Sequence, residues 1–414
     1  MWVGGDAITT GDGRGKRMNG FGTGRSRVAA GLLAVVATVA LLAGCSSGAS
    51  GASGGSAGAA TTTPAPIPVS YEPGVNAANV SPIAPVSASL GDGTLRDVAL
   101  RAADGDTVAG AVSPDGKRWS STAPLAYGTT YTWSGTASGA SGASSPLNGS
   151  FTTLKPASQI RGSLNIGDGR SVGVAAPIEI QFDGTVKDRA SVERSLKVTT
   201  STPTEGSWAW LPDQDGGSRV HWRPKDYWKS GTKVSVEANL LGTSFGDGAY
   251  GKDDVTSDFT IGRSQIVKAD VNSFRMVVVR DGKQVMDVPA SYGLDADPRR
   301  TTRSGIHVIT EKFTDKEMTS PVFGYDVMEK WAVRMSNNGE FIHANPKSAS
   351  AQGSDNVTHG CVNLSTSDAK TFYDSAMYGD PVEVTGSGVD LSPKDGDIYD
   401  WAVPYDKWKA QSAL

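Results

Sequence analysis

A cysteine in a short glycine-containing run is the residue of this chain best suited to covalent chemistry. Cys361 lies in the run THGCVNLS, residues 358–365, and is one of two cysteines in 414 residues. His343 lies eighteen positions before it, in the run EFIHANP. A thiol becomes a strong nucleophile when a neighbouring base takes its proton. The pattern therefore predicts acyl transfer through a thioester on Cys361.

The two histidines near Cys361 are expected to play different roles. A free thiol has a pKa near 8.5, so it needs a base to be a thiolate at neutral pH. We assign that role to His343, and His359 fits better as a structural or substrate-side group. A base needs an acceptor on its second ring nitrogen. No acidic residue is adjacent to His343 in sequence, and the backbone carbonyl of Ala344 is the candidate acceptor.

Gly360 precedes the cysteine and allows the main chain to approach a substrate closely. The amides of Gly360 and Cys361 are the expected oxyanion donors. In the alternative interpretation, Cys361 is a small buried hydrophobe beside incidental histidines. A His-Gly-Cys triplet is an improbable coincidence, which makes that alternative the weaker one.

Strands and one helix are expected to position these residues. Asp281-Gly282 is a strong hairpin turn between two β-rich runs. His307 alternates with apolar neighbours and is interpreted as a residue on a strand face. Residues 312–330 show no clear period and are predicted to form a long loop, such as a lid. A helix is expected from Ser365 or Ser367 to about Met377, beside the cysteine.

The N-terminus carries the features of a secretion signal. Basic residues precede an apolar run, residues 28–42, which is shorter than the roughly 20 residues of a membrane-spanning helix. The run ends in LAGC at Cys45, which resembles a lipobox, so we expect lipidation of Cys45. A plain signal peptide and an uncleaved anchor remain alternatives. Met18 is a plausible start besides Met1.

The segment after Cys45 and the overall charge limit the possible partners. Residues 46–65 are almost entirely Ser, Gly, Ala and Thr, which predicts a flexible tether. A net charge of −4 argues against nucleic acid as a partner.

Two β-rich units follow the tether, at residues 66–156 and 157–263. In each, a Gly-Thr turn begins an alternating strand and a Phe-Thr strand closes the unit, which predicts two tandem immunoglobulin-like sandwiches. Their aspartates lack the spacing of a calcium loop and are interpreted as turn residues. Four tryptophans are interpreted as core residues and not as a sugar-binding strip: Trp208, Trp210, Trp222 and Trp228. Both units are expected to be spacers.

The run around Cys361 and the Phe-Ile-His upstream resemble the L,D-transpeptidases of bacterial cell walls, which have a YkuD-type catalytic domain. The layout of lipobox, two immunoglobulin-like domains, catalytic domain (264–386) and Trp-rich tail (387–414) is similar to actinobacterial members. The resemblance implies a mostly β fold with one main helix and a tail packed on the catalytic domain.

The resemblance also implies roles for individual residues. Cys361 would be the nucleophile, His343 the general base and Ala344 the source of the orienting carbonyl. Residues expected to bind substrate or line the site are Tyr325, Gly339, His359 and Asn363.

The family reaction releases D-alanine from a donor tetrapeptide stem and joins the acyl group to an amine on an acceptor stem, forming a 3→3 cross-link. Carbapenems are the expected inhibitors, and no metal or cofactor is implied. An L,D-carboxypeptidase or hydrolase using the same thiol, and a non-catalytic wall-binding scaffold, are the alternatives. The protein is expected outside the cytoplasmic membrane, anchored by its lipid and facing the cell wall.

Overall fold

The computed structural model describes residues 66–139, 142–392 and 400–414. The signal segment, Cys45 and the tether lie outside the described residues. Within the described part of the chain, no helix is long and apolar enough to span a membrane.

The fold is mostly β, as predicted, and contains three main apolar cores. They are built from residues between Val80 and Phe151, between Ile160 and Ile261, and between Val267 and Val384. Each core is built from the inward-facing apolar side chains of the strands of one domain.

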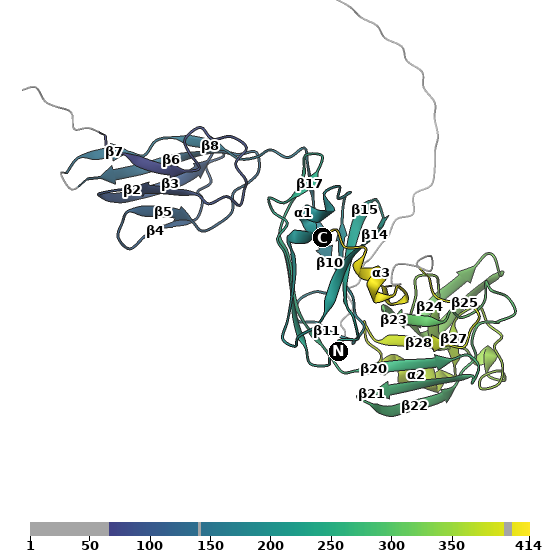
Figure 1. Cartoon of the computed structure of the whole chain (residues 1–414). Helices are drawn as coiled ribbons and strands as arrows, with labels where there is room; N and C mark the ends of the chain where they lie inside the picture. The colour runs from purple at the N-terminus through teal and green to yellow at the C-terminus, as the bar shows by residue number, and fades with distance from the viewer. Residues whose placement is uncertain (1–65, 140–141, 393–399) are drawn as a thin grey trace, which may run out of the picture. The chain divides into compact units, whose positions relative to one another are not determined.

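The first domain is a sandwich of two four-stranded sheets (Figure 1). One sheet has the order β1 (Val69–Glu72), β2 (Ser87–Leu90), β5 (Arg118–Ser121), β4 (Gly110–Val112). In the other, β3 (Thr94–Ala102) pairs with β6 (Thr130–Ser138), which also pairs with β7 (Ser144–Pro146) and β8 (Ser150–Thr152).

The second domain is also a sandwich. One sheet has the order β10 (Gly162–Leu164), β12 (Ile178–Phe182), β15 (Gly217–Pro224), β14 (Gly206–Gln214). The other has the order β11 (Ser171–Val172), β19 (Val255–Ile261), β16 (Lys233–Ala238), β13 (Leu196–Thr200). A small sheet contains β17 (Ser244–Gly246), β18 (Ala249–Gly251) and β9 (Ser158–Ile160), and α1 spans Arg189–Arg194. The four tryptophans interpreted as core residues are all buried in this domain.

The third domain contains two sheets and the main helix. The five-stranded sheet has the order β22 (Lys283–Pro289), β21 (Arg275–Arg280), β20 (Gln265–Asp270), β28 (Pro381–Thr385), β23 (Gly305–Val308). The four-stranded sheet has the order β24 (Glu311–Ser320), β25 (Tyr325–Arg334), β26 (Phe341–Ala344), β27 (Val362–Leu364), and a 3₁₀ turn, η1, spans Pro346–Ser348. Helix α2 (Thr366–Ser375) begins at its predicted cap, where Ser365 Oγ accepts the amide of Asp368 at 3.1 Å.

The prediction of a long loop at residues 312–330 is wrong. The chain there forms the antiparallel hairpin β24–β25, with paired residues from Glu311↔Arg334 to Ser320↔Tyr325. The exposed part of the hairpin has polar residues on both faces, so it lacks the apolar alternation that marks a half-buried strand. Gly324, with φ +68°, makes the tight turn.

The predicted packing of the C-terminal tail on the catalytic domain is correct for only part of its length. The backbones of Ser304 and Leu391 are hydrogen-bonded, which joins the first part of the tail to the third domain. Trp408, in contrast, is buried against Ala209 and Leu211 of β14, in the second domain. Its Nε1 donates to the carbonyl of Ser207 at 2.9 Å.

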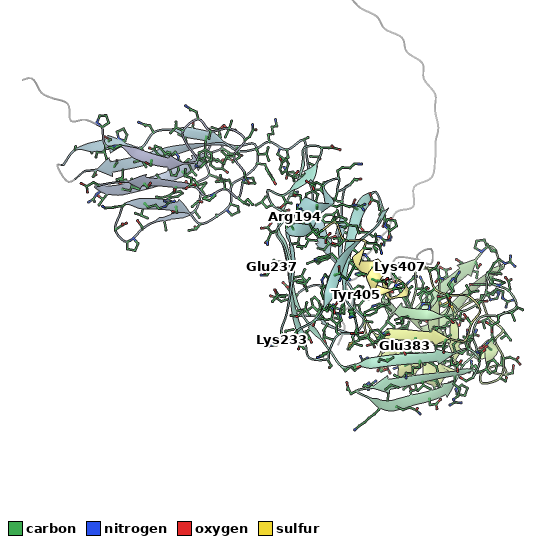
Figure 2. All side chains as sticks on the ribbon, viewed as in Figure 1. Arg194, Lys233, Glu237, Glu383, Tyr405 and Lys407 are labelled. Atoms are coloured by element: carbon green, nitrogen blue, oxygen red, sulfur yellow. The ribbon has the colours of Figure 1, made fainter. Side chains whose placement is uncertain are left out.

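The alternation of β14 explains this packing. Trp208 and Trp210 turn into the core of the sandwich, so Ala209 and Leu211 form an apolar patch on the other face. Helix α3 (Tyr405–Lys409), on which Figure 2 shows Tyr405 and Lys407, carries Trp408 onto that patch. The tail also includes the 3₁₀ turn η2 (Asp400–Ala402).

Candidate active site

Two neighbouring parallel strands bring Cys361 and His343 together. β26 contains His343, and Cys361 directly precedes β27. The register pairs Ile342 with Val362 and His343 with Asn363. Every residue of both strands is buried, which fixes the backbone on either side of the thiol and the imidazole.

The imidazole of His343 is oriented by its own strand. Its Nδ1 lies 2.9 Å from the carbonyl oxygen of Ala344, which is the hydrogen bond expected from the sequence. Because a carbonyl only accepts, Nδ1 is the protonated nitrogen in this contact, and Nε2 is left for Cys361. The Cys361 side chain is half-buried, and its Sγ lies 3.7 Å from the carbonyl oxygen of Gly339.

A carboxylate that the sequence did not predict also faces His343. Glu329 Oε2, on β25, lies 3.6 Å from His343 Nδ1. Sequence reasoning missed it because residues 312–330 were interpreted as a loop. Read as a strand, the segment would have placed Tyr325 and Glu329 on one face by alternation.

The surroundings of His343 favour its protonated form. Burial lowers the pKa of His343, but its hydrogen bond with Cys361 and its interaction with Glu329 outweigh burial and raise the pKa to about 10. An imidazolium beside the thiol favours the thiolate.

The backbone before Cys361 has the conformation that the predicted oxyanion site needs. Gly360 has φ +108°, a region that other residues rarely adopt. Thr302 Oγ1 donates to the carbonyl of Gly360 at 2.8 Å and anchors the turn. No acceptor in the described part of the chain takes the amide hydrogen of Gly360 or Cys361.

Asn363 does not face the substrate side, contrary to the prediction. It is 1% exposed, and its Nδ2 lies within 2.8 Å of Ser291 O, Thr358 Oγ1 and Cys361 O. Its Oδ1 accepts from Asn345. These contacts make Asn363 a brace for the cysteine turn, because a buried amide satisfied by protein groups is unavailable to a ligand.

Aromatic side chains from the hairpin and the cysteine turn meet beside the thiol. The ring of His359 lies 4.7 Å from that of Phe323 and 5.2 Å from that of Tyr325, between centroids. Burial, and to a smaller extent the nearby Cys361, raises the pKa of Tyr325. Burial and Arg300 lower the pKa of His359, so this ring is neutral at pH 7.

Residues 264–384 match the family model for the L,D-transpeptidase catalytic domain (YkuD), and residues 77–244 match a bacterial Ig domain. L,D-transpeptidase 5 of Mycobacterium tuberculosis (strain ATCC 25618 / H37Rv) is 54% identical over 357 residues, which cover 86% of this chain and 79% of that protein. The chain belongs to the L,D-transpeptidase family.

Further similarities concern other members of the family. This L,D-transpeptidase is 38% identical to L,D-transpeptidase 2 of M. tuberculosis (strain CDC 1551 / Oshkosh) over 345 residues, which cover 81% of this chain and 83% of the relative. Among solved structures, an LD transpeptidase in complex with imipenem is 32% identical, with a TM-score of 0.47. The match covers 56% of this chain and all of that one.

Proposed function

We propose that this enzyme cross-links peptidoglycan through a thioester on Cys361. The observation that supports this proposal is that His343, oriented by the Ala344 carbonyl, interacts with the only cysteine in the described residues. The donor is a tetrapeptide stem, and the bond broken joins its diamino acid to the terminal D-alanine.

In the acylation step, the thiolate of Cys361 attacks the carbonyl carbon of that bond. The amides of Gly360 and Cys361 bind the oxyanion, which is supported by the finding that neither amide has an acceptor among the described residues. The imidazolium of His343 gives its proton to the departing amine, so D-alanine leaves and a thioester remains.

In the second step, the amine of a diamino acid on an acceptor stem attacks the thioester. His343, now neutral, takes the amine proton, and the thiolate leaves as the 3→3 amide forms. Tyr325, His359 and Gly339 line the site for these stems, consistent with their positions around the thiol.

We also propose that the enzyme acts outside the cytoplasmic membrane, where peptidoglycan lies. Cys45 would carry the lipid anchor. Mass spectrometry of the mature N-terminus tests this placement: a diacylglycerol adduct on Cys45 is expected, and an unmodified terminus beyond Cys45 would contradict it.

The cross-linking proposal is tested by incubating the protein with a disaccharide tetrapeptide and analysing the products by mass spectrometry. A dimer lacking one D-alanine is expected, and Cys361→Ala should give none. Accumulation of tripeptide alone would instead identify a hydrolase. Absence of any product and of any imipenem adduct on Cys361 would favour a non-catalytic scaffold.

A further inference from the structure

We propose that Glu329 is a positioning residue whose carboxylate stabilises the imidazolium of His343 and thereby keeps Cys361 as a thiolate. This inference rests on the proposed roles of His343 and Cys361. It adds a charged third member to a pair otherwise oriented by a backbone carbonyl.

The distances define how Glu329 acts. The Nδ1 hydrogen of His343 is already donated to the Ala344 carbonyl at 2.9 Å. Glu329 Oε2, at 3.6 Å from the same nitrogen, is too distant for a good hydrogen bond but within ion-pair distance. Its effect on His343 is therefore one of charge, and it is strong because the two side chains are only 4% and 12% exposed.

The backbone beside Glu329 is distorted in a way that suits this contact. Lys330 pairs with Ala344 and Val333 with Ile342, so β25 contains one residue more than β26 at this point. Trp331 in this bulge has φ +54°, a costly conformation for a bulky residue. Bulges and strained residues of this kind are frequent next to active sites, where they redirect side chains.

Other charged groups nearby have partners of their own. Lys330 Nζ binds Asp315 at 2.8 Å, and the Nζ of Lys316, the register partner of Glu329 on β24, lies over the Phe313 ring. Helix α2 packs against β26 with its buried residues, Ala369 and Phe372. Among the described residues, the titratable groups that contribute most to the raised pKa of His343 are Cys361 and Glu329.

The proton balance needs no further reactant. The thiol proton of Cys361 moves to Nε2 of His343, and Glu329 neither gives nor takes a proton in the proposed step. Removing its charge should lower the pKa of His343, since the interaction with Glu329 is one of the causes that raise it. The imidazolium, which protonates the leaving amine, would then be lost at a lower pH.

The decisive variant is Glu329→Gln, which keeps the shape and removes the charge. Asp326→Asn is the matched control, because Asp326 is an exposed carboxylate on the opposite face of the same strand. Glu329→Asp is the conservative variant expected to restore part of the effect. Far-UV circular dichroism and thermal unfolding verify that all variants fold.

The first measurement is an NMR titration of His343 in the mature chain labelled at histidine. In Glu329→Gln, the midpoint should fall by about one pH unit, since an opposite charge at this distance typically shifts a pKa by 1–3 units. Asp326→Asn should match the wild type. An unchanged His343 titration in Glu329→Gln overturns the inference, whatever the enzyme does.

The second measurement is the rate of imipenem acylation against pH. The alkaline limb should move to lower pH in Glu329→Gln by the same amount as the titration, with Glu329→Asp intermediate. Superimposable profiles for the wild type and Glu329→Gln would overturn the inference. If Cys361→Ala still forms the adduct, the proposed function fails instead, and the NMR titration still decides the role of Glu329.

Discussion

Two buried histidines of this chain have similar electrostatic surroundings and different capacities for chemistry. His221 Nδ1 lies 3.0 Å from Asp400 Oδ2, and its Nε2 lies 3.9 Å from Glu179 Oε2. Burial lowers the pKa of His221, but the two carboxylates outweigh burial and raise it. His343 also has a raised pKa and a nearby carboxylate.

The difference lies in the second ring nitrogen. In His221 both nitrogens face carboxylates, and Tyr378 donates its hydroxyl to Glu179, so the ring is enclosed by fixed partners. In His343 one nitrogen faces a carbonyl and a carboxylate, and the other faces a thiol. A raised pKa therefore marks both sites, and only the thiol makes one of them reactive.

The position of His221 suggests a structural role. Asp400 belongs to the tail, and its neighbourhood includes Arg223, whose guanidinium donates to the carbonyls of Asp400 and Val403. Arg223 also lies over the rings of Trp401, Tyr405 and Trp408, at 4.7 to 5.4 Å. The His221–Asp400 pair thus ties the tail to the second domain.

The largest expected effect separates the two histidines by activity. His343→Gln should lower the rate of Cys361 acylation by about 10²–10⁴-fold, because the thiol loses its proton acceptor. His221→Gln should acylate at nearly the wild-type rate at temperatures where it is folded. Imipenem acylation followed by intact mass measures both, and equal losses would remove the distinction between the sites.

The next largest expected effect is on the stability of the fold, and it concerns His221. His221→Leu leaves the buried Asp400 and the partly buried Glu179 without their cation, which should cost about 3–5 kcal/mol of unfolding free energy. Denaturant unfolding followed by tryptophan fluorescence measures the loss. The double variant His221→Leu/Asp400→Leu should recover part of the lost unfolding free energy. If its loss instead equals the sum of the losses in the two single variants, the two residues are not a coupled pair.

A smaller effect concerns pH. The folded pKa of His221 lies above its unfolded value, so its contribution to stability is complete below about pH 6.5 and is lost as pH rises through the folded pKa. Burial raises the pKa of Glu179, which also makes stability fall with rising pH. Melting temperatures above pH 6.5 should therefore decline less steeply in His221→Gln than in the wild type. Parallel declines would contradict this assignment.

Sequence alone determined the features that depend on neighbouring residues. The Asp281-Gly282 turn, the Ser365 cap of α2 and the bond from His343 to the Ala344 carbonyl all involve residues no more than three positions apart. The alternation of apolar and polar residues along the strands also predicted the mostly β fold and the buried tryptophans. The thiol and its histidine were predictable because few residue types perform this chemistry.

Tertiary structure alone decided which distant groups meet. His221 and Asp400 are 179 positions apart, and Glu329 reaches His343 through the pairing of β25 with β26 and a one-residue bulge. The pairing of β26 with β27 enclosed Asn363, and the pairing of β24 with β25 made a hairpin of the predicted loop. Such contacts depend on register, and a shift of one residue turns a side chain to the opposite face, so local patterns do not specify them.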